Sequence, residues 1–339
     1  MTETRAEAAG RLAALVGEFT RRRVTVVGDL VADRFVYGEI SRVSREAPVL
    51  ILRHERTETV AGGAANCAAN LASLGARAAI VGVVGDDAAG LALLENLRAA
   101  GVDCDGVTVS PAHETPTKVR ILAGHSHSTR QQVIRLDYEG ARHASDDGLR
   151  AEIARRASDA AAASDAVIIS DYDYGVAAPD LVGHLRAGAE RRPVLVDSRF
   201  RLAEFAGVTS ATPNEDEVEQ LAGERLDTVE RLEAAGLGLR ERLDLDALLI
   251  TRGSRGMMLV ERGRRPFHLA AVGAHTAVDV TGAGDTVIAA YTLALASGAT
   301  YGEAARLANH AGGVVVTKRG TATVSGEELL ASVRTHEQG

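Results

Sequence analysis

Short apolar runs rich in valine and isoleucine alternate along the chain with longer segments of helical periodicity. This alternation is typical of parallel strands joined by crossover helices, so it predicts an α/β fold with helices on both faces of a mostly parallel sheet. Several runs end in a polar residue, at the edge where such sheets bind their ligands. The predicted strands are residues 23–30, 78–85, 165–171, 193–198, 207–214, 246–253 and 256–261.

Two segments interrupt this rhythm, residues 35–60 and residues 115–137. Both alternate between polar and apolar positions, as antiparallel strands do, where a crossover helix would otherwise be expected. We therefore predict a small β-sheet that folds over the ligand-binding edge as a lid. An amphipathic stretch predicts an N-terminal helix at about residues 5–20. Because no Pro- or Gly-rich linker divides the chain, residues 1–339 are expected to form a single domain.

The composition narrows the class of protein. The chain has 339 residues, of which 46% are hydrophobic and 25% charged, as in ordinary globular proteins. Its formal net charge of −8 argues against nucleic acid or a membrane surface as the main partner, because both are polyanionic. Cys67 and Cys104 lie far apart without the spacing of a zinc site or a disulfide framework, and no apolar run is long enough to span a membrane. We expect a cytoplasmic protein.

The segment DVTGAGDT, residues 279–286, is the sharpest local signal, and an apolar helical run follows it directly. Its glycines allow the main chain to approach a ligand closely, and the first amides of a helix favour a bound anion. Asp285, in the first helical turn, stays ionised near the helix dipole and can accept a proton from a hydroxyl that attacks a bound phosphate. The alternative is an ordinary helix start with an acidic residue in its first turn.

The segment GGAAN, residues 62–66, precedes another predicted helix. Paired glycines let the main chain contact a polyhydroxylated ligand, and the Asn66 amide offers both a donor and an acceptor. A simple turn before a helix would explain the same residues.

The segment TPNEDE, residues 212–217, places Asn214 at the end of a predicted strand and Glu217 three residues later. Amide and carboxylate oxygens at this spacing can hold a hydrated Mg²⁺. The same spacing is that of a helix capping box, and the two interpretations are compatible.

Basic side chains cluster in the two lid segments of an otherwise acidic protein. Together they can clamp a phosphate group of a substrate, although any single one can equally be solvated surface. They are Arg42, Arg45, Lys118, Arg120 and Arg135. Motifs of P-loop proteins, protein kinases, α/β-hydrolases and zincins are absent from the sequence.

These motifs resemble those of the PfkB (ribokinase-like) carbohydrate kinases, a family with an early Gly-Gly sugar motif and a late D-T-x-G-A-G-D signature. From about Val24 to Val324, the chain is most similar to the branch of D-glycero-β-D-manno-heptose-7-phosphate kinases of bacterial ADP-heptose synthesis. The segments that carry the resemblance are VVGDLVADRFVYGEISRVSREAPV, GGAANCAANLASLGA, TPTKVRIL, QQVIRLDYE, SDYDYG, TPNEDEVE and DVTGAGDTVIAAYTLALASG.

The resemblance implies a ribokinase-like three-layer α/β/α sandwich and an enzyme that uses ATP and Mg²⁺ to phosphorylate the anomeric hydroxyl of a heptose 7-phosphate. Asp285 would be the catalytic base, and the amides of Gly282, Ala283 and Gly284 would stabilise the transferring phosphoryl group. Many relatives form homodimers through their lids. The other implied sites are Asp29, Asp33, Gly62, Gly63, Asn66 and Asp171 for the sugar; Arg42, Lys118, Arg120 and Arg135 for its phosphate; Thr251, Gly253 and Gly256 for ATP; Asn214 and Glu217 for Mg²⁺ through water; and Asp279 and Thr281 for a monovalent cation such as K⁺.

Two positions depart from the pattern of this branch. Tyr174 stands where Ser-Asp-Tyr-x-Lys-Gly has its lysine, and Arg199 stands where Asp-Pro-Lys has its lysine. Arginine keeps the positive charge with a different shape, whereas tyrosine does not replace it. A PfkB kinase for another sugar or sugar phosphate is therefore the first alternative, and a non-catalytic sugar-binding regulatory protein is the second. Since the chain stops at Gly339 without an H-x-G-H-type motif, we expect a stand-alone kinase that lacks a nucleotidylyltransferase domain.

Overall fold

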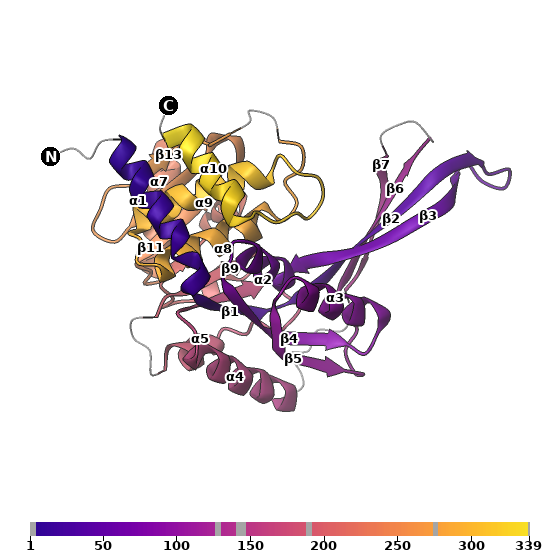
Figure 1. Cartoon of the computed structure of the whole chain (residues 1–339), viewed down its shortest axis with the longest axis horizontal. Coiled ribbons are helices and arrows are strands. Elements are labelled where there is room, and N and C mark those ends of the chain that lie inside the picture. Colours follow the sequence, from indigo (N-terminus) through magenta and orange to yellow (C-terminus); the bar gives the residue numbers. More distant parts are fainter. Residues whose placement is uncertain (1–4, 126–129, 140–146, 188–191, 274–276, 338–339) are drawn as a thin grey trace.

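The computed structural model describes residues 5–125, 130–139, 147–187, 192–273 and 277–337. Within them, a nine-stranded sheet lies between two layers of helices, and a four-stranded sheet projects from one side of this body (Figure 1). This arrangement confirms the predicted α/β fold with a mostly parallel central sheet and a smaller second sheet. None of the helices in the described ranges is both long enough and apolar enough to cross a membrane.

The central sheet is parallel over seven strands and antiparallel at one edge. Strand β12 pairs antiparallel with β11, whereas β11 pairs parallel with β10. The strand direction therefore changes at β11. Only a short 3₁₀ turn separates β11 from β12, which is too short for a parallel crossover connection. The strands in spatial order are β13 (Phe267–Leu269), β12 (Met257–Glu261), β11 (Ala247–Thr251), β10 (Ser210–Ala211), β9 (Val194–Ser198), β8 (Ala166–Asp171), β1 (Arg23–Gly28), β4 (Arg77–Gly85) and β5 (Asp103–Ser110).

The helices divide into two layers according to the apolar cluster they join. One layer contains α1 (Arg5–Gly17), α2 (Ala64–Ser73), α3 (Ala88–Ala99), α8 (Ala283–Ala296), α9 (Tyr301–Val315) and α10 (Gly326–Glu337). The other contains α4 (Asp147–Ala162), α5 (Leu181–Arg186), α6 (Glu215–Ala222) and α7 (Val229–Arg242).

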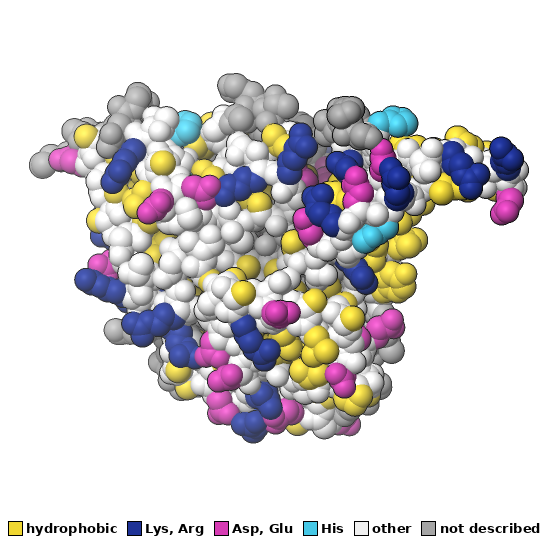
Figure 2. Space-filling view, turned by 45° about the vertical axis from the view of Figure 1, so that its right-hand side comes forward, with side chains coloured by type: hydrophobic (Ala, Val, Ile, Leu, Met, Phe, Trp, Pro, Cys, Tyr) yellow, Lys and Arg dark blue, Asp and Glu magenta, His cyan; other side chains and the backbone are white. Residues whose placement is uncertain are grey.

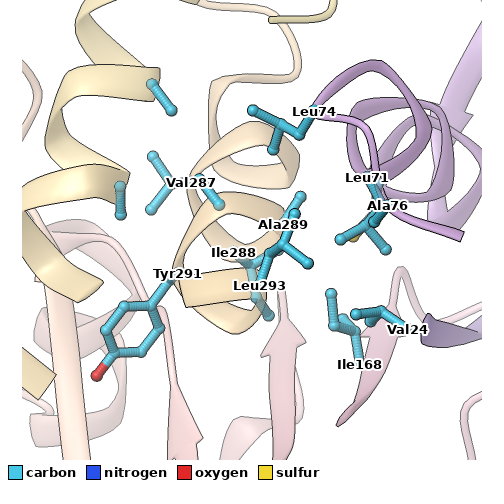
Figure 3. Packing of buried hydrophobic residues seen from close by; sticks show 14 of the residues in the cluster. Val24, Leu71, Leu74, Ala76, Ile168, Val287, Ile288, Ala289, Tyr291 and Leu293 are labelled. Carbon is cyan, nitrogen blue, oxygen red and sulfur yellow. The ribbon is translucent and has the colours of Figure 1, made fainter. Parts of the chain in front are cut away.

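The core explains why the central strands read as continuous apolar runs. Val26 of β1 packs in one cluster and its neighbour Val27 in the other, because successive side chains of a strand point to opposite faces. Helix α8 is buried on nearly every side, and its Ile288 and Leu293 pack near Val24 of β1 (Figure 3). Such burial fixes the position of the turn before α8, where the sharpest sequence signal lies.

The lid consists of β2 (Leu30–Val43), β3 (Leu50–Gly63), β6 (Thr117–Gly124) and β7 (Gln131–Tyr138), in the order β3-β2-β6-β7. In its register, Asp33 lies opposite Lys118, which lies opposite Asp137, so the three side chains share one face. Val119 and Leu136 are paired on the other face. The lid therefore has a polar face and an apolar face.

Four details differ from the sequence predictions. Strand β13, which pairs antiparallel with β12 at the edge of the sheet, was not predicted. The N-terminal helix α1 ends at Gly17, and a separate 3₁₀ turn follows it. The lid strands begin five residues earlier than expected, at Leu30. Strand β5 was not predicted, because its sequence DCDGVTVS has few apolar residues; it pairs in parallel with β4 at the edge of the sheet.

Candidate active site

The carboxylate of Asp285 is buried in the first turn of α8, where the residue is only 3% exposed. One of its oxygens accepts a hydrogen bond of 2.8 Å from the side-chain amide of Asn66 on α2. The other accepts one of 3.0 Å from the hydroxyl of Tyr172, in the loop after β8. Burial raises the pKa of Asp285 to about 7, although both hydrogen bonds oppose this shift. A carboxylate with such a pKa can act as a general base near neutral pH.

The turn before α8 depends on Gly282, whose φ of 75° is left-handed. A β-carbon at this position would lie 2.5 Å from Nδ2 of Asn66. Glycine therefore leaves room for Asn66 to reach Asp285. The structure brings the predicted segment of Gly282, Ala283 and Gly284 next to Asp285, but the Ala283 amide already donates to the Val280 carbonyl at 3.2 Å. In this state the three amides do not all form an open anion hole.

A second carboxylate, Asp33 on β2, lies where the lid joins the body. It is buried, accepts a hydrogen bond of 3.0 Å from the Thr321 hydroxyl, and forms an ion pair with Arg120 of β6. A β-carbon at Gly62 would lie 2.9 Å from Oδ2 of Asp33, so glycine permits this close approach. Arg120 was expected to bind a substrate phosphate. Its charge is instead compensated within the protein by Asp33.

Asp29 and Asp171, two further residues predicted to bind the sugar, accept hydrogen bonds from the protein's own loops. The carboxylate of Asp29 accepts three backbone amides from residues 172–176, at 2.8 to 3.1 Å. The carboxylate of Asp171 accepts a hydrogen bond of 2.6 Å from Ser198 and pairs with Arg201. Without a ligand, protein donors occupy the oxygens of both carboxylates, and the role of Asp29 and Asp171 at the sugar stays a prediction.

Asn214 and Glu217 form the capping box of α6. The Glu217 amide donates to Oδ1 of Asn214 at 2.9 Å, and the Asn214 amide donates to Glu217 at 2.8 Å. Burial raises the pKa of Glu217 to about 7, and burial together with the negative charge of Glu217 raises that of Asp197 on β9 to about 7. Two neighbouring carboxylates of this kind, with hard oxygen atoms, fit a hydrated Mg²⁺ whose charge would offset theirs. The capping role and the metal role remain compatible.

Asp279 and Thr281 lie together in the turn before α8, as expected. The Asp279 carboxylate accepts the backbone amides of Thr281 and Gly320, both at 2.9 Å. Although burial alone would raise the pKa of Asp279, these bonds hold it below its usual range, so the group stays ionised.

A cavity of about 200 Å³ lies beside the start of α8, and its walls are mainly apolar. Three residues expected at the nucleotide site, Thr251, Gly253 and Gly256, line it together with Gly284. A flat heterocyclic base suits such walls. The other lining residues are Ser254, Met257, Ala271, Val272, Ala277, Val280, Ala283, Val287, Asn309, Gly312, Gly313 and Val316.

A second cavity, of about 230 Å³, lies between the lid and the loop after β8. We call it the cationic pocket after Lys118, Arg135 and Arg199, which line it together with Tyr172, Tyr174 and Phe200. Three carboxylates, those of Asp137, Glu139 and Asp173, line it as well. Burial lowers the pKa of Lys118, and the charges of Arg199 and Arg135 add to this effect although nearby carboxylates oppose it. Arg135 pairs with an aspartate, whereas Lys118 and Arg199 have no ion-pair partner among the described residues. An anionic ligand in this pocket would therefore pair with Lys118 and Arg199.

Arg42 lies outside this arrangement. It is exposed and stands nine residues beyond Asp33 along β2 (42 − 33), which corresponds to about 30 Å of strand. In a single chain Arg42 is thus distant from the site at Asp33, and its contribution to sugar-phosphate recognition stays a prediction. Arg45 lies still further along the same ribbon.

The structure adds site residues that sequence reasoning did not assign. Tyr172 was part of the quoted segment SDYDYG, and Asp197 ends a predicted strand, so both carried a signal. Thr321 and Asn309 carried none, because only the tertiary fold brings them beside Asp33 and the apolar cavity.

Comparison with known proteins assigns the family. The model of the pfkB family carbohydrate kinases matches residues 21–328. The bifunctional protein HldE of Aeromonas salmonicida (strain A449) is 42% identical over 95% of this chain and 66% of its own length, and that of Edwardsiella ictaluri (strain 93-146) is 44% identical over 94% and 64%. The chain thus spans about two thirds of the length of these curated relatives.

Solved structures show the same fold at lower identity. Ribokinase of Arabidopsis thaliana complexed with ribose and ATP has a TM-score of 0.71 at 23% identity, covering 92% of this chain and 99% of the ribokinase. Phosphofructokinase-2 of Escherichia coli in complex with potassium has a TM-score of 0.74 at 18% identity, covering 94% and 99%. Since the family model matches most of the sequence, the chain belongs to the pfkB family of carbohydrate kinases, phosphotransferases with an alcohol group as acceptor.

Proposed function

We propose that this chain transfers the γ-phosphoryl group of ATP to the anomeric hydroxyl of D-glycero-β-D-manno-heptose 7-phosphate and gives the 1,7-bisphosphate for ADP-heptose synthesis. The observation that carries the proposal is the carboxylate of Asp285, buried at the start of α8 with two hydrogen-bond donors on its oxygens. The high identity to bifunctional HldE proteins over this part of their length supports the choice of sugar.

In the proposed reaction, Asp285 accepts the proton of the anomeric hydroxyl while the hydroxyl oxygen bonds to the γ-phosphorus. The bond from that phosphorus to the bridging oxygen breaks, and ADP leaves with the electron pair. Amides near Gly282 and Gly284 stabilise the charge on the phosphoryl oxygens at the helix start. The apolar cavity lined by Thr251, Gly253 and Gly256 supports a nucleotide base beside them.

A bound Mg²⁺ would neutralise charge on the ATP phosphates. Glu217 and Asn214 would hold it through water, as their oxygens at the start of α6 allow. Asp279 and Thr281 would take a monovalent cation such as K⁺.

The cationic pocket supports a substrate that carries its own phosphate. The Nζ atom of Lys118 lies 5.3 Å from the centre of the Tyr172 ring, and the Tyr172 hydroxyl contacts Asp285. One tyrosine side chain therefore separates the pocket from the reacting carboxylate. A sugar that spans this length would place its hydroxyl at Asp285 and its phosphate near Lys118 and Arg199.

Another phosphorylated sugar is the alternative substrate. Tyr174 and Arg199 line the cationic pocket, and both differ from the lysines of the heptose kinase branch. Their shape and charge would change which sugar phosphate fits. The second alternative, a non-catalytic sugar-binding regulatory protein, predicts binding without turnover.

The test is an ADP-release assay with Mg-ATP and a panel of acceptors. The panel contains D-glycero-D-manno-heptose 7-phosphate, sedoheptulose 7-phosphate, fructose 6-phosphate, ribose and no sugar. Preference for the heptose phosphate is the expected result. Preference for another sugar would replace the substrate while keeping the kinase, and sugar binding without ADP release would favour the regulatory protein.

We also propose that the chain forms a homodimer through its lids. The apolar lid face carries Ile134 and Leu136 of β7, which are 53% and 45% exposed, and Figure 2 shows apolar side chains along the projecting lid. A second copy would cover this face. Both cysteines, Cys67 and Cys104, are buried free thiols, which supports a cytoplasmic location.

A further inference from the structure

Tyr172 contacts the proposed catalytic carboxylate, although the chemistry of phosphoryl transfer does not require a tyrosine there. Its hydroxyl donates to Oδ1 of Asp285 at 3.0 Å, while Asn66 donates to Oδ2. Each carboxylate oxygen thus has one fixed donor and keeps a further lone pair for a substrate hydroxyl.

The rest of Tyr172 is held as firmly as its hydroxyl. Its backbone amide donates to Asp29 at 2.8 Å. One ring edge packs on Gly63, where a β-carbon would lie 3.3 Å from Cδ2 of the tyrosine. The ammonium group of Lys118 lies over the ring. A side chain fixed at the backbone, the ring and the hydroxyl can hold the carboxylate it touches in one orientation.

We propose that Tyr172 is a positioning residue for the phosphoryl transfer, which keeps the Asp285 carboxylate oriented and ionised through its hydroxyl. The proposal rests on the proposed function, since it takes Asp285 as the general base. It gives Tyr172 no contact with the transferring phosphoryl group and no proton to transfer.

The charges around Asp285 show why this donor matters. Asp33 from β2 and Asp197 from β9 face it with negative charge, and the Cys67 thiol from α2 lies close enough to feel the charge of Asp285. The two aspartates, and burial itself, favour the protonated acid, which cannot act as a base. Within the described part of the chain, Asn66 and Tyr172 oppose this effect with hydrogen bonds. The pKa of Tyr172 lies well above its usual value, mainly because of burial, so the hydroxyl keeps its proton and remains a donor.

The test is the pH dependence of kcat for Tyr172→Phe between pH 5.5 and 9, with the sugar that the wild-type enzyme prefers. Loss of a donor to the charged form raises the pKa of Asp285, so the acid limb should move to higher pH by about one unit. At pH 6 the kcat should be about tenfold lower than in the wild type, and near pH 9 it should recover. A loss of kcat by the same factor at every pH would overturn the proposal.

Tyr291→Phe is the matched control. Tyr291 lies on the same helix, is fully buried, and accepts a hydrogen bond of 3.4 Å from Ser210, but it does not contact Asp285. Removal of the Tyr291 hydroxyl should leave the acid limb of the kcat profile at the wild-type pH. Thermal unfolding of both variants verifies that each is folded at the assay temperature.

A second readout does not depend on turnover. The ¹³C carboxyl signal of Asp285, assigned by its absence in Asp285→Asn, should titrate about one pH unit higher in Tyr172→Phe than in the wild type and Tyr291→Phe. If no sugar is phosphorylated, the proposed function fails, and this shift alone decides whether Tyr172 tunes the carboxylate. If sugar is phosphorylated and the signal does not move, the kinase stands and the role of Tyr172 is refuted.

Discussion

The side-chain amide of Asn66 donates a hydrogen bond of 2.8 Å to the carboxylate of Asp285, which lies 219 residues later in the chain. This bond joins the starts of two helices, α2 and α8, that each follow a glycine-rich turn. It brings the two sharpest sequence motifs together in one site. Several consequences of this arrangement can be measured.

Replacement of the proposed base should strongly lower turnover while leaving nucleotide binding intact. We expect Asp285→Asn to lower kcat by about 10³-fold, because asparagine cannot accept the proton but leaves the helix start in place. The dissociation constant of Mg-ATP should stay within about twofold. Asp147→Asn, at the exposed first turn of α4, is the control and should have wild-type kinetics. Near-normal turnover of Asp285→Asn would refute the proposed mechanism.

The turn before α8 should tolerate no side chain at Gly282. In Gly282→Ala, the left-handed φ of 75° and the approach to Asn66 would strain the turn, so we expect a loss of about 1–2 kcal/mol of stability and about 10²-fold of kcat. Gly302→Ala is the control, because no atom lies within 4 Å of its β-carbon and its φ is not positive. That variant should be as stable as the wild type or slightly more stable. Thermal unfolding and kcat of both variants decide the question.

The cationic pocket should determine affinity for the sugar phosphate. We expect Lys118→Ala to raise KM for the phosphorylated sugar about tenfold or more and to leave KM for ATP unchanged, since it removes one charge-assisted hydrogen bond to the phosphate. Arg334→Ala, on the exposed side of α10 and outside the lid, is the control and should leave both KM values unchanged. An unchanged KM in Lys118→Ala would remove this residue from substrate binding.

The buried carboxyl groups should make the ligand-free protein less stable as the pH rises. Burial raises the pKa of Asp29 to about 6, and that of Asp197, Glu217 and Asp285 to about 7. The native state therefore binds more protons than the unfolded chain between about pH 4 and pH 7, and stability from these groups is lost as the pH rises through that window.

Asp197→Asn isolates one of these groups. At pH 8 it should be more stable than the wild type by about 1–2 kcal/mol, because it removes a buried charge, and the difference should shrink at pH 5.5. Denaturant unfolding at the two pH values measures both numbers. A difference that does not depend on pH would contradict the raised pKa of Asp197.

The apolar face of the lid should hold two copies together. Light scattering after gel filtration should find a dimer for the wild type and a monomer for Leu136→Lys, since a charge on this face prevents its burial. Leu91→Lys, on the exposed side of α3 where the leucine is 51% exposed, is the control and should remain dimeric. A wild-type monomer would refute the dimer.

The sequence by itself determined the architecture and the centre of the site. The spacing of apolar residues along the chain reports directly which positions are buried, so the alternating strands and helices and the second sheet were predictable. Glycine before a helix is a local signal, so the segments 62–66 and 279–286 could be found. The two edge strands, β5 and β13, were not predicted, since β5 has few apolar residues and β13 has only three residues. The direction of β12 depended on the short connection before it.

Only the tertiary structure decided which partners the polar residues have. The sequence predicts Asp29, Asp171 and Arg120 as ligand-binding residues. In the fold, Asp29 accepts backbone amides of a loop, Asp171 forms an ion pair with Arg201, and Arg120 forms one with Asp33. Tyr172 and Thr321 gained contacts with buried carboxylates from far along the chain. Hydrogen bonds and ion pairs act over a few ångströms. The distance between two segments of the chain is set by the packing of the whole core, and a local sequence pattern does not contain that information.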